Sequence, residues 1–138
     1  MLRGDYSIQI DFDSLVDDPD PIVRLLAFNV AGSYGSLIGV QKIGADKNFH
    51  CSFRTATIFD AQTNIARTND YGKLRQRRVG SDVYNECQDG AGGWQLINSK
   101  TQNTDDLLVK LHAKTYATST QSCNFDNFVI NSGTIIGV

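Results

Sequence analysis

Hydrophobic and polar residues alternate along several short stretches of the chain, which is the pattern of half-buried β-strands. Stretch 6–12 has Tyr, Ile, Ile and Phe at every second position. In stretch 49–57, Phe and Cys residues alternate with His, Ser and Arg, which places the two sets on opposite faces of a strand. Further strands are predicted in runs between turn-forming residues, at 22–30, 37–43, 65–68, 107–113 and 125–131. Strands at a spacing of roughly ten residues are typical of an all-β sandwich or jelly roll.

Two polar segments, 60–64 and 98–106, are rich in turn-forming residues and are predicted as loops. Segment 107–113 has mixed helical and strand character, and its all-β surroundings favour a strand. Residues 135–138 either extend the last strand or lie outside it. The whole chain, 1–138, is predicted to be a single domain.

The most regular prediction is a β-hairpin within 71–97. A Gly-Ser pair at 80–81 lies between two strand-like runs, and its glycine supplies the positive φ of a two-residue type II′ turn. This register places Arg75 opposite Glu86, a favourable cross-strand pair. One face then carries Leu74, Gln76, Arg78, Val83, Asn85 and Cys87. The other, polar face carries Lys73, Arg75, Arg77, Tyr84, Glu86 and Gln88.

Composition strengthens the all-β prediction. Glu86 is the only glutamate among 15 acidic residues in a chain of 138 residues. Glutamate favours helix interiors, whereas Asp, Asn, Ser, Thr and Gly favour turns and caps. The formal net charge of −2 gives no electrostatic reason to expect nucleic acid or a membrane surface as a partner.

The sequence predicts neither a membrane span nor a leader peptide. No run of about 20 apolar residues occurs, and residues 1–9 lack the apolar centre of a signal peptide. Two expectations stay open for the location. The protein is cytoplasmic, or this chain is the mature or excised domain of a secreted or periplasmic protein.

Three cysteines are present, Cys51, Cys87 and Cys123. An odd number leaves at least one free thiol, which excludes a disulfide-stabilised scaffold. Buried thiols are expected, with one disulfide among them left open. No pair has the CxxC spacing of a metal site.

Several short motifs carry a family resemblance. The chain reads G-K-L-R at 72–75, R-V-G-S at 78–81, D-G at 89–90, G-W at 93–94 and F-D-N-F-V-I at 125–130. This series resembles the hairpin block and closing strand of concanavalin A-like lectin/glucanase domains, the laminin G-like jelly-roll superfamily, in bacterial members of unknown function. The resemblance implies an antiparallel sandwich of two curved sheets, with the N- and C-terminal strands close in space. It implies sugar binding, glycan hydrolysis or protein binding as candidate activities.

Hydrolysis is disfavoured among these activities. Glycoside hydrolysis uses two carboxylates at a set separation, and glucanases of this superfamily carry a paired-glutamate motif, E-x-D-x-x-E, which a chain with one glutamate lacks. Asp11 and Asp13 offer an alternative pair only in principle. Cys51 is adjacent to His50, but neighbouring strand residues point to opposite faces, so they form no catalytic dyad. We therefore expect a protein that is not an enzyme.

Carbohydrate binding on the polar hairpin face is the leading functional prediction, because sugar sites combine an aromatic platform with planar polar groups. The candidate residues for binding an oligosaccharide or polysaccharide are Arg75, Arg77, Tyr84, Glu86, Gln88, Trp94 and Tyr116. On a concave sheet this face forms a groove; otherwise it is the solvated outer face of the sandwich. The alternative function is a protein-interaction or structural module, with a protein partner in place of a sugar.

Calcium is the one cofactor that the sequence suggests, and the predicted function does not require a cofactor. Hard cations bind clustered oxygen ligands, and Asp13 and Asp126 come close if the terminal strands are adjacent. A second acidic cluster lies at 17–20, without EF-hand spacing. The basic run at 75–78 divides its charges between two strand faces, so nucleic acid is not expected as a partner.

Overall fold

Strands form the regular secondary structure in the part of the chain that the structure describes. The structure is a computed structural model, and it describes residues 1–14, 21–56, 58–115 and 122–137. Its strands are β1 (Leu2–Asp13), β2 (Pro21–Asn29), β3 (Gly35–Ile43), β4 (Asp46–Thr55), β5 (Ile58–Ala66), β6 (Gly72–Val79), β7 (Asp82–Asp89), β8 (Gln95–Thr101), β9 (Leu107–Thr115) and β10 (Asn124–Ile135). Within these residues there is no helix of the length and apolarity needed to cross a membrane.

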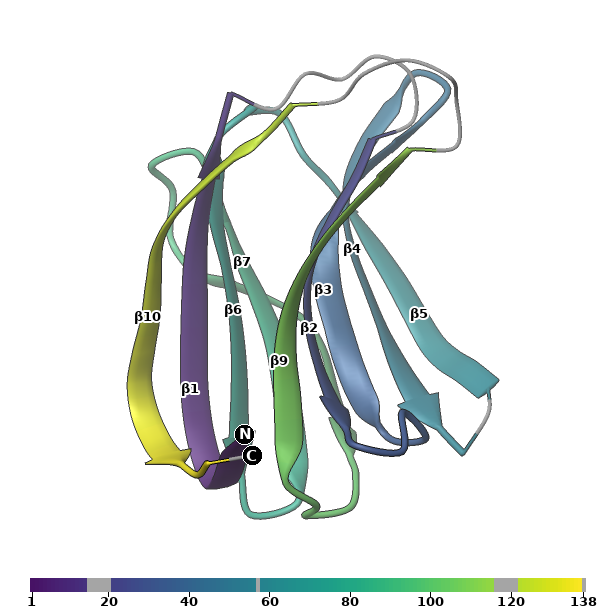
Figure 1. Ribbon diagram of the computed structural model, residues 1–138. Helices are drawn as coiled ribbons and strands as arrows, with labels where there is room; N and C mark the ends of the chain where they lie inside the picture. The colour runs from purple at the N-terminus through teal and green to yellow at the C-terminus, as the bar shows by residue number, and fades with distance from the viewer. Residues whose placement is uncertain (15–20, 57, 116–121, 138) are drawn as a thin grey trace.

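Antiparallel pairing connects the strands into one curled sheet (Figure 1). Hydrogen-bonded neighbours follow the order β5-β4-β3-β2-β9-β1-β6-β7-β8, and β10 pairs with β1 off this path. β1 pairs with β6 from Tyr6 to Phe12 but meets β9 at one pair, Leu2 with Leu107. The sheet therefore has two five-stranded parts, β9-β2-β3-β4-β5 and β10-β1-β6-β7-β8, joined at a narrow point.

The two outer strands of the path, β5 and β8, approach each other through their side chains. Asn98 Nδ2 on β8 donates a hydrogen bond to the Ala61 carbonyl on β5 at 2.9 Å. Lys100 Nζ lies 2.5 Å from the Asp60 carboxylate. The sheet is consequently nearly closed and barrel-like. The prediction of an all-β fold is confirmed, and the two-sheet jelly roll stays a prediction.

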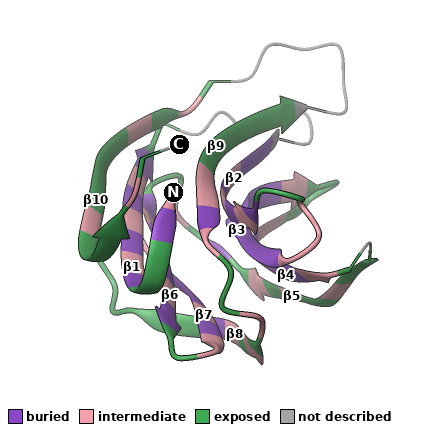
Figure 2. Cartoon of the chain, turned by 60° about the horizontal axis from the view of Figure 1, so that its bottom comes forward, coloured by how far each residue is buried: buried purple, intermediate pink, exposed green. Residues whose placement is uncertain are grey.

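The hydrophobic core lies between the two parts of the sheet, and Figure 2 shows buried inner strands beside the largely exposed β10 and β5. β1 buries every second residue from Tyr6 to Phe12. The opposite part contributes Val23, Leu25, Ala27, Ile38, Val40, Phe49 and Cys51. The rings of Phe12 and Phe49 meet edge to face across this core, with centroids 6.1 Å apart. The alternation in the sequence thus decides which face of each strand is buried.

The predicted hairpin register is confirmed in β6 and β7. Arg75 lies opposite Glu86, and Gly80 has a φ of +60°, as the predicted turn requires. The predicted inner face is buried at all of its positions, Leu74, Gln76, Arg78, Val83, Asn85 and Cys87.

Buried polar side chains tie the two parts of the sheet together. The Tyr6 hydroxyl donates to Gln76 Oε1 at 2.9 Å, and Gln76 Nε2 donates to Asn85 Oδ1 at 3.0 Å. Asn85 Nδ2 in turn donates to the Ser36 hydroxyl at 2.7 Å. Ser36 belongs to β3, whereas the other three residues belong to β1, β6 and β7. Because buried polar groups are costly without partners, this chain of hydrogen bonds favours one relative placement of the two parts.

One segment that the sequence predicts as a loop, and part of a second, are strands, and there the prediction was wrong. Residues 60–64 lie within β5 and residues 98–101 complete β8, whereas residues 102–106 lie between β8 and β9 outside any strand, as predicted. Both strands end the sheet path, and most of their side chains are exposed or half-buried. They consequently lack the hydrophobic alternation by which a half-buried strand is recognised.

The cysteines are free thiols, with Cys51 and Cys87 buried and Cys123 partly buried. Burial raises the pKa of the Cys51 thiol and of the Cys87 thiol to about 12. Both groups are therefore protonated at neutral pH and behave as small core side chains.

Candidate functional site

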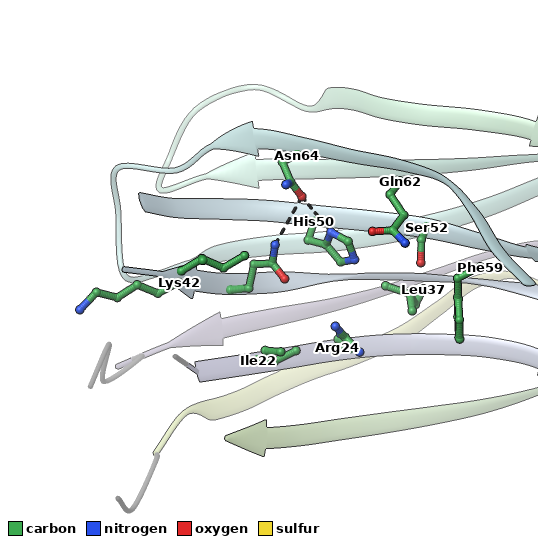
Figure 3. A pocket seen from close by; sticks show the side chains of 11 residues that line it. Ile22, Arg24, Leu37, Lys42, His50, Ser52, Phe59, Gln62 and Asn64 are labelled. Carbon is green, nitrogen blue, oxygen red and sulfur yellow. Dashed lines mark hydrogen bonds between the residues drawn. The ribbon is translucent and has the colours of Figure 1, made fainter. Parts of the chain in front are cut away.

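A pocket of about 600 Å³ opens on the face of β2–β5 that points away from the hydrophobic core. Its lining side chains, shown in Figure 3, are Ile22, Arg24, Leu37, Gln41, Lys42, Ile43, His50, Ser52, Phe59, Gln62 and Asn64. Most of them alternate along each strand with core residues, so pocket and core occupy opposite faces of the same strands.

Strand register brings polar residues from neighbouring strands into one row across the pocket. Arg24 on β2 lies opposite Gly39 on β3, Gly39 lies opposite His50 on β4, and His50 lies opposite Asn64 on β5. A Cβ at position 39 would lie 2.7 Å from Arg24 Cγ. The missing side chain at Gly39 therefore leaves space for the Arg24 side chain to lie over β3.

His50 supplies a hydrogen-bonding group of fixed orientation. It is 8% exposed, and its Nδ1 lies 2.8 Å from Asn64 Oδ1. An amide oxygen only accepts, so Nδ1 carries the hydrogen and the neutral ring keeps its lone pair on Nε2. Asn64 Oδ1 also accepts from Gln41 Nε2 at 3.4 Å. Burial lowers the pKa of His50 and the nearby Arg24 charge adds to this effect, while the hydrogen bond that His50 donates to Asn64 acts in the opposite direction. His50 is therefore neutral at pH 7.

Phe59 gives the pocket an aromatic surface. It is 42% exposed, and it meets Phe28 edge to face with ring centroids 6.2 Å apart. The Arg54 guanidinium lies 5.2 Å from the Phe59 ring centroid. Gly35 on β3 makes room for the Phe28 ring, since a Cβ at position 35 would lie 2.5 Å from that ring. The Phe59 ring is thus held by neighbours while part of it stays accessible.

The pocket lining suits the recognition of hydroxyl groups. Gln41, Gln62 and Asn64 carry amides that both donate and accept, and Ser52 adds a hydroxyl. The lining residues include no carboxylate, so the pair that glycoside hydrolysis uses is not found among them. Ser52 and His50 share the face but form no hydrogen bond with each other in the described structure. Ser52 and His50 are therefore not paired as nucleophile and base.

The predicted ligand residues of the hairpin cluster on the outer face of β6–β8. Glu86 accepts hydrogen bonds from Arg75 Nε at 2.7 Å and from Arg77 Nε at 2.8 Å. The Arg75 guanidinium lies 4.0 Å from the Trp94 ring centroid, and the Arg77 guanidinium lies 5.0 Å from that of Tyr84. The sequence prediction that these side chains share a face is therefore confirmed, without bearing on whether they bind a ligand.

Glu86 and Gln88 in this cluster already have hydrogen-bond partners within the protein. Burial is the largest influence on the Glu86 pKa and raises it, yet the hydrogen bonds and charges of Arg77 and Arg75 bring that pKa below its ordinary value. Gln88 Nε2 donates to the Gly92 carbonyl at 2.6 Å, within its own turn. The remaining predicted residue, Tyr116, lies outside the described residues.

Asp13 and Asp126 lie on the adjacent strands β1 and β10 but accept separate hydrogen bonds. Asp13 Oδ1 accepts from Asn124 Nδ2 at 2.9 Å, and Asp126 Oδ1 accepts from the Asn127 backbone N–H at 2.7 Å. Among the described residues, no three His, Cys, Asp or Glu side chains gather as metal ligands would. The acidic cluster at 17–20 lies outside those residues.

Sequence reasoning did not single out the pocket on β2–β5, although two signals for it exist. The alternation in stretch 49–57 already places His50 and Ser52 on one polar face. Gly35 and Gly39 are four residues apart on β3 and therefore share a face. Glycine within a strand often marks the close approach of other groups, and here it marks the pocket side.

Comparisons with known proteins support the fold alone. The chain matches no family model and no curated protein. It is similar in structure to a functionally unknown protein from Saccharomyces cerevisiae, known from a crystal structure, with a TM-score of 0.80. The match covers 96% of this chain and 71% of the yeast chain at 10% sequence identity. This arrangement of strands therefore occurs in a protein of very different sequence.

Proposed function

We propose that the protein is a non-catalytic carbohydrate-binding module whose ligand occupies the pocket on β2–β5. The observation that carries the proposal is the combination of an accessible ring, Phe59, with the hydrogen-bonded group of His50, Asn64 and Gln41. Sugar hydroxyls bind planar polar groups, and the C–H faces of sugar rings lie on aromatic ones. Because hydrogen bonds already orient His50 and Asn64, less conformational entropy is lost when a ligand binds.

The pocket is favoured over the hairpin face that the sequence predicts as the ligand site. On the hairpin face, Glu86 is engaged by both Arg75 and Arg77, and these guanidinium groups lie over Trp94 and Tyr84. A sugar binding there would have to compete with charged hydrogen bonds, which are the stronger kind. In the pocket, the Nε2 lone pair of His50 and the exposed amide of Gln62 remain for a ligand.

The alternative proposal is a protein-interaction or structural module. Among the described strands, β10 pairs with β1 alone, which leaves its other edge open. Phe128, Val129 and Ile135 on this strand are 45%, 39% and 67% exposed. An open edge with exposed apolar side chains suits pairing with a strand of a partner protein.

We also propose a distant relationship to the concanavalin A-like jelly rolls. The adjacency of β1 and β10 supports it, because the resemblance implies neighbouring terminal strands. The core between two five-stranded parts supports it as well. An experimental structure with β1 and β9 paired along their whole length, as one closed sheet, would contradict the proposal.

The first experiment is a glycan-array screen of the protein, with calcium in one lane and a chelator in the other. A hit is then titrated by calorimetry against two pairs of folded variants. Phe59→Ala and Gln62→Ala change the pocket, while Arg77→Ala and Tyr84→Ala change the hairpin face as matched controls. Loss of the Phe59 platform is expected to cost about 1 kcal/mol, or roughly fivefold in affinity, and the hairpin variants should bind as the unchanged protein does.

The outcomes separate the candidate functions. Weaker binding in the hairpin variants alone would show that the ligand binds on the outer face of β6–β8. A hit that disappears only with chelator would establish calcium as a cofactor. A blank array in both lanes would refute carbohydrate binding and favour the protein-interaction module.

A further inference from the structure

The pocket face of β9-β2-β3-β4-β5 has a charge opposite to that of the chain as a whole. The chain has 13 Lys and Arg against 15 Asp and Glu. Cα partners across the strands have side chains on the same face, and by this register the pocket face carries the basic residues Arg24, Arg54, Lys110 and Lys114. Among the described strand residues, Asp46, at the start of β4, is the only carboxylate at a position on this face. The fold therefore concentrates positive charge here.

The basic residues of β9 continue the row of polar groups in the pocket. His112 on β9 is the Cα partner of Arg24, which lines the pocket, and Lys110 is the partner of the neighbouring Leu26. The row from His112 through Arg24, Gly39 and His50 to Asn64 crosses five strands. Four strand spacings make it about 19 Å long. A ligand longer than the pocket would therefore extend over β9.

Lys110 and His112 carry most weight in this argument. Both are exposed, and Lys110 forms no ion pair with any residue that the structure describes. Arg24 and Lys114 have further interactions within the protein, so their charges are partly engaged. A surface lysine that forms no ion pair within the protein attracts an anionic ligand, and a neutral ligand gains nothing from this attraction.

We propose that the ligand is an acidic oligosaccharide, a chain of carboxylate-bearing sugars that lies in the pocket and extends across β2 to Lys110 and His112. The inference rests on the proposed function, in which Phe59 and the amide groups recognise the sugar rings. What is new is that the ligand carries negative charge. Carboxylates fit the charged hydrogen-bond donors of Arg and Lys. An all-neutral glycan would leave the basic side of the face without a role.

The test compares an oligogalacturonate with its fully methyl-esterified form, which keeps the rings and removes the charges. Calorimetry should show the acidic form binding at least tenfold more tightly and weakening as salt is added. Lys110→Gln and His112→Gln, made singly, should each weaken the acidic form about 2–5-fold and leave the esterified form unchanged. Lys73→Gln, on the other part of the sheet, makes the same change in net charge as Lys110→Gln and should have no effect.

Equal binding of the two forms, with Phe59→Ala weakening both, would overturn the acidic specificity and leave carbohydrate binding intact. An equal loss in Lys73→Gln would show a general charge effect and overturn the inference. Failure of both forms to bind would overturn the inference and count against the proposed function. Single-stranded DNA that binds as tightly as the oligogalacturonate, with the same loss in the β9 variants, would assign the face to a different polyanion.

Discussion

Arg78 provides the sharpest test of how the two parts of the sheet are held together. Its side chain is 1% exposed. Nε and Nη2 donate to the Gly4 carbonyl at 2.8 and 2.5 Å, and Nη1 donates to the Asp105 carbonyl at 2.8 Å. The guanidinium also lies 5.3 Å from the Tyr6 ring centroid. One buried cation thus joins the start of β1 to the segment that leads into β9, beside the narrow junction of the sheet.

Replacement of Arg78 by Met keeps much of the side-chain volume and removes the three hydrogen bonds. A hydrogen bond from a charged donor contributes about 1.5–3 kcal/mol, while removal of a buried charge recovers several kcal/mol of desolvation. We expect a net loss of about 3 kcal/mol, because the Gly4 and Asp105 carbonyls both lose their charged donors. For a domain of this size, that lowers the melting temperature by roughly 10 °C.

Urea unfolding followed by the fluorescence of Trp94, the single tryptophan, measures the free energy of unfolding. Arg78→Lys keeps the charge but cannot reach both carbonyls in the same way, so its stability should fall between those of the original protein and Arg78→Met. A Met variant as stable as the original protein, within about 0.5 kcal/mol, would refute the reasoning. It would show that desolvation of the guanidinium offsets its hydrogen bonds, as happens in some proteins with buried charges.

Three further predictions concern the pocket, a loop and the hairpin. Gly39→Ala puts a Cβ 2.2 Å from the Val23 carbonyl oxygen. It should lower the free energy of unfolding by about 1–3 kcal/mol and weaken glycan binding. Unchanged urea unfolding would contradict this close approach of the Val23 carbonyl. Four hydrogen bonds to Asp89 outweigh its burial and lower its pKa in the folded state below 3.8, so Asp89→Asn should cost about 1–2 kcal/mol at pH 7. That difference should shrink as the pH falls from the unfolded-state pKa through the folded-state pKa, and a difference that stays constant as the solution is acidified would contradict the assignment. Glu86→Gln removes two ion pairs and should cost about 1–2 kcal/mol in urea unfolding while it alters Trp94 emission; unchanged emission would show that the ion pairs do not position the ring.

The hairpin of β6 and β7 was predictable because its determinants are local. A two-residue turn with glycine at 80 sets the register, and once Arg75 is opposite Glu86 the two faces follow from period-two alternation. β1 was predictable for the same reason, since its buried positions recur at every second residue. The hairpin register depends on residues within a few positions of the turn, whereas alternation in β1 predicts its buried face but not its distant partners β6 and β10.

The pocket depends on long-range pairing, which the sequence alone does not provide. β9 lies between β2 and β1, although more than 75 residues separate it from β2 in the chain. The row from His112 to Asn64 exists only because this insertion and three successive hairpins align five strands. β5 was predicted in part as a loop, so the strand that carries Phe59 and Asn64 was not placed beside β4. Alternation could identify the polar face of each strand but not which polar faces are neighbours.

The two parts of the sheet differ in what their polar groups are used for, and this difference favours the pocket as the site. In the part with β1, β6 and β7, Gln76, Asn85 and Arg78 are buried and engaged within the protein, and Glu86 is engaged by arginines on the outer face. In the part with β2–β5, the hydrogen bond between His50 and Asn64 leaves Nε2 for a ligand. Groups that are fully engaged stabilise a fold, whereas groups that are oriented but incompletely engaged can bind a ligand without rearrangement. On this physical ground, the pre-oriented polar surface in the pocket on β2–β5 is a better binding site than the more strongly charged hairpin face.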